Sequence, residues 1–187
     1  MPNDTTKSIR DDRNDEQRIE VGSRLVRIRT DEDPESPREW SNLGTMICWH
    51  RRYNLGDRHA FADPESFEHW LARNPAIVLP LYLYDHSGIT MNTTGFSCPW
   101  DSGQVGYIYV TLADVRSEYA KRRISGRTRK LAEECLRQEV ATYDDYLAGR
   151  VYGFIVEDTD GETIDSCWGF FGLDYCIEQA TESARAL

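Results

Sequence analysis

The chain has 187 residues, a length that suits one globular domain. Apolar residues make up 40% of it and aromatic residues 11%, which excludes a wholly disordered protein. The net charge of −10 disfavours unaided binding to DNA or to an anionic membrane surface.

The first 20 residues predict a disordered polar tail, because charged and polar residues follow one another there with almost nothing apolar between them. They hold no apolar stretch of the kind that a secretory signal contains. The five cysteines are odd in number and form no CxxC pair, so free thiols and a cytoplasmic location are expected. No apolar run reaches the roughly 18 residues of a membrane span, and we expect no membrane partner.

Residues 21–187 predict a single α+β domain with about six strands and about four helices. The pair Asp160–Gly161 separates two apolar runs and is typical of a β-hairpin turn. We therefore expect a mixed or mainly antiparallel sheet. Its strands are predicted from apolar runs of strand length at residues 25–29, 45–50, 77–84, 104–111, 151–157 and 162–168.

The helices are predicted from capping residues and from apolar periodicity. Asp63 and Pro64 are typical of a helix N-terminus, and a further short helix is expected over residues 112–120. The clearest helix spans residues 128–147, where apolar residues recur at spacings of three and four. Residues 173–186 close the chain as a fourth helix.

Charge is distributed unevenly along the sequence. Residues 157–187 hold eight acidic residues against Arg185 alone, whereas residues 121–130 hold six cations and no acid. A dense field of carboxylates can bind a basic protein surface, although a solvated surface has the same sequence pattern. The acidic residues expected to bind a partner are Glu157, Asp158, Asp160, Glu162 and Asp165.

The basic segment lies where the long helix is predicted to begin. Free N–H groups and the helix dipole favour anions at such a terminus, so a phosphate or nucleic-acid contact is an alternative function. The net charge disfavours it, and no aromatic residue lies among the cations, as single-strand binders require. The candidate residues are Arg122, Arg123, Arg127, Arg129 and Lys130.

Two further sets of residues are candidates for chemistry. Cys98 with His86 as base, oriented by Asp85 or Asp101, contains the three groups that a cysteine-dependent hydrolase or transferase needs. Cys48, His50, His86 and Cys98 are ligand types that bind zinc, but their spacing matches no finger or ribbon, so no metal or cofactor is expected.

A Cys lies close to a Trp in three segments that are also rich in glycine: Cys48–Trp49, Cys98–Trp100 and Cys167–Trp168. We expect these segments to meet in the core, because Trp and Cys fill cores and Gly permits close backbone approach. If the fold contains a pocket, we expect these segments to line it.

Four stretches together resemble a family of acidic proteins carried by phages, plasmids and other mobile elements: WSNLGTM (40–46), WHRRYNLGD (49–57), LYLYDHSGITM (81–91) and CPWDSGQVGYIYV (98–110). The resemblance covers about residues 38–172. It implies a genomic setting in which small acidic proteins interfere with host defence or replication enzymes, and it implies no catalytic residue.

The sequence thus favours a non-enzymatic protein that binds a basic host protein through an acidic surface. A Cys/His-dependent enzyme and a nucleotide or nucleic-acid binder remain the alternatives, and self-association is open. Which Cys, His and Trp residues are neighbours cannot be read from their positions in the sequence.

Overall fold

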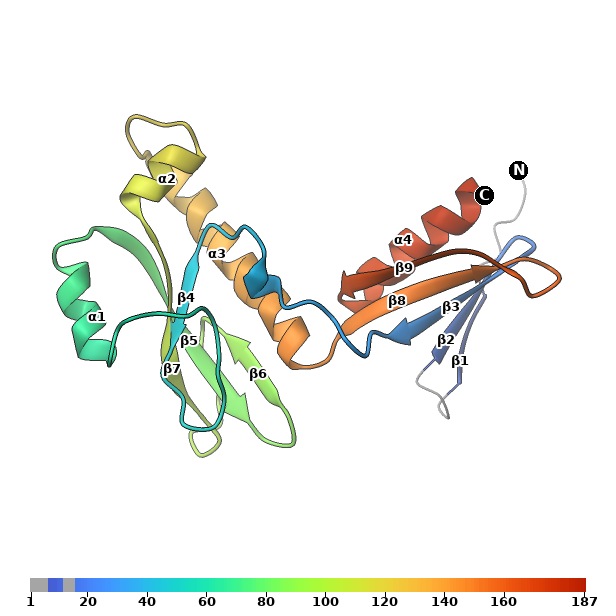
Figure 1. The fold of residues 1–187 in the computed structure, drawn as a ribbon, viewed down its shortest axis with the longest axis horizontal. Coiled ribbons are helices and arrows are strands. Elements are labelled where there is room, and N and C mark those ends of the chain that lie inside the picture. The colour runs from blue at the N-terminus through green and yellow to red at the C-terminus, as the bar shows by residue number, and fades with distance from the viewer. Residues whose placement is uncertain (1–6, 12–15) are drawn as a thin grey trace. The chain divides into compact units, whose positions relative to one another are not determined.

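The computed structural model describes residues 7–11 and 16–187, and it has the predicted α+β class (Figure 1). Two antiparallel sheets and four α-helices account for most of the described residues. The chain divides into two compact units. Unit 1 comprises Met1–Glu35 and Gly149–Leu187, and unit 2 comprises the intervening Ser36–Ala148.

The sheet of unit 1 has the strand order β1-β2-β3-β8-β9, with every neighbouring pair antiparallel. Helix α4 packs against this sheet, and it closes the chain over Leu173–Ala186 (Figure 1). The strands span Lys7–Asp11 (β1), Glu16–Val21 (β2), Arg24–Thr30 (β3), Val151–Glu157 (β8) and Thr163–Phe171 (β9).

The core of unit 1 lies between the sheet and α4. Side chains of a strand alternate between its two faces, so Val26 and Ile28 of β3 reach the core while Arg27 points to the other face. On that other face Glu16 is only 2% exposed, and its carboxylate contacts the guanidinium groups of Arg18, Arg27 and Arg29. We call this side of the sheet the arginine face.

The predicted disordered tail is wrong for the residues of β1 and β2. Ile19 and Val21 of β2 are 1% and 5% exposed and belong to the core of unit 1. Beside these two apolar positions, Glu16 and Arg18 of the same strand join the ionic network of the arginine face. The rest of the predicted tail, residues 1–6 and 12–15, lies outside the described residues.

The sheet of unit 2 has the strand order β4-β7-β5-β6 and is also antiparallel throughout. Its strands span Thr45–Cys48 (β4), Ala76–Asp85 (β5), Ile89–Asn92 (β6) and Ser102–Thr111 (β7). Its helices span Pro64–Leu71 (α1), Leu112–Glu118 (α2) and Gly126–Leu147 (α3), and a 3-10 turn covers Pro37–Glu39.

Helix α3 covers one face of this sheet and α1 the other. Ile108 and Val110 of β7 share a core with the buried stripe of α3, which includes Ala132 and Leu136. The alternate β7 residues point to the opposite face, where Tyr107 and Tyr109 contact Phe67 of α1 at ring distances of 5.3 and 5.1 Å. Both faces of the sheet are therefore packed within unit 2.

A buried ionic clasp ties α3 to the start of β4. The guanidinium of Arg38 donates to Asp57 at 2.9 and 2.6 Å, to Glu139 at 3.0 Å and to the carbonyl of Gly44 at 2.7 Å. Burial acts to lower the pKa of Arg38, but the hydrogen bonds and charges of the two carboxylates outweigh it and raise the pKa. The clasp therefore gives Arg38 and Asp57 a structural role.

Most elements lie where the sequence predicts them, while the strands divide between two sheets instead of forming one of about six strands. The hairpin at Asp160–Gly161 joins β8 to β9, and Gly149 follows α3 with a φ of +67°. Strand β6 was not predicted. None of the described helices is both apolar enough and long enough to span a membrane.

Candidate functional site

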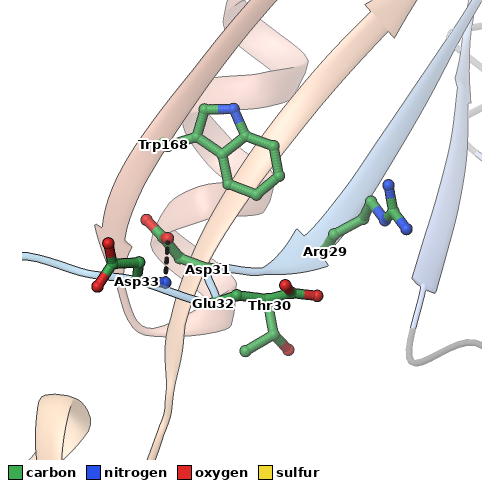
Figure 2. Close-up of a pocket in the computed structure, with 6 residues that line it drawn as sticks. All are labelled: Arg29, Thr30, Asp31, Glu32, Asp33 and Trp168. Carbon is green, nitrogen blue, oxygen red and sulfur yellow. Dashed lines mark hydrogen bonds between the residues drawn. The ribbon is translucent and has the colours of Figure 1, made fainter.

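A pocket of about 400 Å³ opens on unit 1 where β3 ends (Figure 2). Its walls come from two parts of the chain that are far apart in sequence. Trp168 of β9 supplies an aromatic wall, and the end of β3 with the following loop supplies the polar walls. The lining residues are Arg29, Thr30, Asp31, Glu32, Asp33 and Trp168.

The indole of Trp168 is held over Gly153 of β8. A Cβ atom built on Gly153 would lie 2.1 Å from Cε3 of Trp168, a distance at which the two side chains cannot coexist. Gly153 is the register partner of Arg29, so the indole lies on the arginine face. Trp168 nevertheless remains 45% exposed, so the rest of its surface is available to a ligand.

The carboxylates beside the indole sit on a turn that the backbone holds in place. The N–H of Asp31 donates to the carbonyl of Val151 at 2.8 Å and so extends the pairing of β3 with β8. The Oδ1 atom of Asp31 accepts from the N–H of Asp33 at 3.2 Å, the dashed line in Figure 2. The side chains of Glu32 and Asp33 are exposed.

Arg29 is the one cation among the lining residues. Its Nε lies 3.6 Å from the carboxylate of Glu16, within the arginine face. Figure 2 shows its guanidinium directed away from Asp31 and Asp33. Three of the six lining residues are therefore acidic against one cation, and Figure 2 shows Asp31 beneath the indole.

An aromatic face beside carboxylates is suited to a cation. The face of an indole attracts a guanidinium or ammonium group, and carboxylates accept its N–H hydrogen bonds. Anions are disfavoured in this pocket, because three of its lining residues carry negative charge. The geometry thus fits the side chain of an Arg or a Lys.

The two units differ in net charge. Unit 1 holds 18 acidic and 9 basic residues, a net charge of −9, while the whole chain has −10. Unit 2 is therefore close to neutral. The loop at Asp31–Asp33 adds to the predicted acidic region within the same unit.

The five predicted acidic residues have different local roles. Glu157 forms an ion pair with Arg27 at 2.5 Å. Asp158 accepts from the N–H groups of Asp160 and Glu162 and thereby shapes the hairpin turn. Asp165 accepts from the hydroxyl of Ser183 on α4.

The side chains of Asp160 and Glu162 are exposed, and within unit 1 neither forms an ion pair with a described residue. Asp174, Glu178 and Glu182 of α4 are likewise exposed. Some carboxylates of the predicted acidic surface are therefore engaged in ion pairs or hydrogen bonds within unit 1, while the others face the solvent.

Three of the four catalytic candidates, Cys98, Asp101 and His86, lie together in unit 2. They are not arranged as a nucleophile beside its base, because the carboxylate lies between the thiol and the imidazole. The Oδ2 atom of Asp101 accepts from the thiol of Cys98 at 3.7 Å and lies 3.4 Å from Nδ1 of His86. Asp85 is engaged elsewhere, by Arg52 at 3.0 Å and by the hydroxyl of Tyr53 at 3.2 Å.

A cysteine nucleophile needs a base beside its sulfur and an acid behind that base. Here the carboxylate of Asp101 stands next to the thiol, with the imidazole of His86 on the carboxylate's other side. The backbone carbonyl of Asp101 also accepts from the N–H of Asp85 at 2.8 Å. This arrangement favours a role in joining two loops.

The four possible metal ligands are not gathered into a ligand set. Over residues 7–11 and 16–187, no three His, Cys, Asp or Glu side chains are placed to hold a metal ion. Nδ1 of His50 accepts from the N–H groups of Arg52 and Tyr53, and its ring stacks on Tyr53. Burial raises the pKa of Cys48 to about 12, which disfavours the thiolate that a metal needs.

The three Cys–Trp segments are divided between the two units. Trp49 packs in the aromatic cluster under α1, Trp100 is 92% exposed, and Trp168 lines the pocket of unit 1. The lining residues that sequence reasoning missed include Asp31, Glu32 and Asp33. Their acidic run was the available signal, but nothing local connects it to Trp168.

No protein-family model, curated protein or solved structure matches the chain.

Proposed function

We propose that this chain is a binding protein whose acidic unit 1 captures a basic surface of another protein. In this proposal the pocket beside Trp168 receives one Arg or Lys side chain of that partner. The observation that carries the proposal is the juxtaposition of a half-exposed indole with the carboxylates of Asp31, Glu32 and Asp33.

The distribution of charge supports the same conclusion. Unit 1 has a net charge of −9, and exposed carboxylates such as those of Asp160 and Glu162 add to the field around the pocket's unit. Such a field speeds the approach of a basic protein and disfavours acidic ones. The pocket then provides a specific anchor, since aromatic residues at interface centres contribute strongly to affinity.

Proteins that handle nucleic acids are the partner class that this chemistry fits best, because they carry clustered Lys and Arg on their binding surfaces. The sequence resemblance to proteins of mobile elements suggests the same partners, namely host defence or replication proteins. An acidic protein that occupies such a basic surface would compete with the nucleic acid itself.

The test uses a short fluorescent peptide in which Arg alternates with Ser, titrated with the full chain at low ionic strength. We expect Trp168→Ala to weaken binding by roughly tenfold, because a partly desolvated cation–π contact contributes about 1–2 kcal/mol. The variant D31N/E32Q/D33N should weaken binding by a similar factor. It keeps the Asp31 acceptor that the turn uses.

Matched controls come from unit 2. Trp100→Ala removes an indole that is 92% exposed, and E65Q/E68Q/E118Q removes three exposed carboxylates. Both controls should bind the peptide within about twofold of the unaltered chain, because they leave the indole and carboxylates of the pocket unchanged. Equal losses in the controls and the pocket variants would contradict the proposal, as would a chain that does not bind the peptide.

A further inference from the structure

The basic segment of unit 2 forms a surface that the acidic pocket does not use. Three of its cations lie in the loop that joins α2 to α3, and three lie in the first turns of α3. Every one of these side chains is exposed: Lys121, Arg122, Arg123, Arg127, Arg129 and Lys130. We call these six residues the basic patch.

The cations of the basic patch form no ion pairs with the carboxylates of unit 2. Within residues 36–148, none of the six side chains has an ion-pair or hydrogen-bond partner. The acids nearest in sequence on α3 are engaged, since Glu133 and Glu134 contact Arg137 at 3.6 and 3.9 Å. The six positive charges therefore all face the solvent without an ion-pair partner in unit 2.

The position of the patch opposes the helix dipole. The first turn of α3 contains no acidic residue, and Ser125 caps it by accepting from the N–H of Thr128. Cations in this turn repel the positive end of the helix and lower its stability. The positive end of the helix and these cations both favour an anion at this place.

We infer that the basic patch binds the phosphate backbone of a nucleic acid. Clustered Arg and Lys side chains neutralise successive phosphates and release the counterions condensed on them. The side chains of Arg127, Arg129 and Lys130 lie outside the buried stripe of α3 that includes Thr128 and Ala132, so they can reach a polyanion without unfolding the helix. With no aromatic residue exposed among the cations, the patch reads charge and not base sequence.

This function is separate from the capture of a basic protein by unit 1. The two surfaces have opposite charge and belong to different units of the chain. Their chemistry would let one chain bind a nucleic-acid-handling protein and the nucleic acid itself. Either function can fail in its own assay without affecting the other.

The experiment measures binding of the full chain to a fluorescent mixed-sequence DNA duplex as ionic strength rises from a low value. The variant R122Q/R127Q/K130Q should bind at least tenfold more weakly at low ionic strength. The slope of log affinity against log salt concentration should also decrease, by about 0.9 for each phosphate that the variant no longer neutralises. The charge-keeping variant R122K/R127K should retain binding.

The matched control is R51Q/R58Q/R73Q, which removes three exposed cations of unit 2 outside the patch and changes the net charge equally. It should bind the duplex within about twofold of the unaltered chain. Equal weakening in both triple variants would overturn the inference, because net charge alone would then explain binding. Failure of the unaltered chain to bind at low ionic strength, or tighter binding to phosphatidylserine vesicles than to the duplex, would also overturn it.

Discussion

At the scale of single residues, Gly153 shows how a missing side chain creates the pocket. Because Gly153 has no Cβ, the indole of Trp168 can pack directly against β8 and line the pocket together with the loop after β3. Any Cβ at this position would meet the indole at 2.1 Å. The aromatic wall of the pocket therefore depends on a residue that does not line it.

We expect Gly153→Ala to displace Trp168 and to destabilise unit 1 by about 1–3 kcal/mol, the usual cost of overpacking. Peptide binding should weaken as it does in Trp168→Ala, because the indole leaves its place beside the carboxylates. Urea denaturation and the peptide titration measure the two effects. Gly103→Ala is the control, since a Cβ there meets nothing within 4 Å. If the chain tolerates Gly153→Ala as well as Gly103→Ala, the close packing of Trp168 on Gly153 is wrong.

The residue scale also marks the limit of inference from the sequence. Cys98, His86 and Asp101 could be grouped in advance because they lie close together along the chain. Their order could not, because it depends on which oxygen of Asp101 the thiol and the imidazole approach. The pocket was harder still, since Asp31 and Trp168 are brought together only by the pairing of β3 with β8 and of β8 with β9.

At the scale of elements, local signals predicted what local interactions determine. The Asp63 capping box, the periodicity of α3 and the Asp160–Gly161 turn are all encoded within a few residues, and each structure forms where expected. Strand β6 is different, because Asp144 of α3 helps to hold it by accepting from the hydroxyl of Thr90 and the N–H of Met91. The four residues of β6 are held as a strand partly by a helix that is distant in sequence, so their own sequence predicts the strand poorly.

Strand β2 provides the test at this scale. Ile19→Ala should destabilise unit 1 by about 2–5 kcal/mol, because it removes buried methyl groups from the core under α4. Thermal denaturation followed by circular dichroism measures the change. Glu20→Ala, at an exposed position of the same strand, should shift stability by less than about 0.5 kcal/mol. If both changes had equal and negligible effects on stability, β2 would not be part of the core, and the prediction of a disordered tail would stand.

At the scale of the whole molecule, the two units have separate hydrophobic cores. One core contains Leu136 and the other contains Val156, and both residues are fully buried. Compact units with their own cores can open separately, because each core contributes its own stability. The charge separation follows the same division, so each unit presents its own electrostatic surface.

We expect Leu136→Ala to speed amide hydrogen exchange mainly within residues 36–148 and Val156→Ala mainly within residues 16–35 and 149–187. Each change leaves a cavity in one core only, at a cost of about 1–5 kcal/mol. Hydrogen exchange read by mass spectrometry resolves the two regions. A uniform loss of protection across both units in either variant would show that they unfold as one.

The insertion of unit 2 between the two halves of unit 1 also has a consequence for biosynthesis. Strand β3 leaves the ribosome long before its partner β8, from which about 120 residues separate it in the chain. At roughly 5–20 residues per second, the nascent chain carries an unpaired strand edge for on the order of 10 s. Unit 2 is contiguous and can fold during that interval, so translation speed over residues 36–148 sets how long that edge stays open to wrong partners.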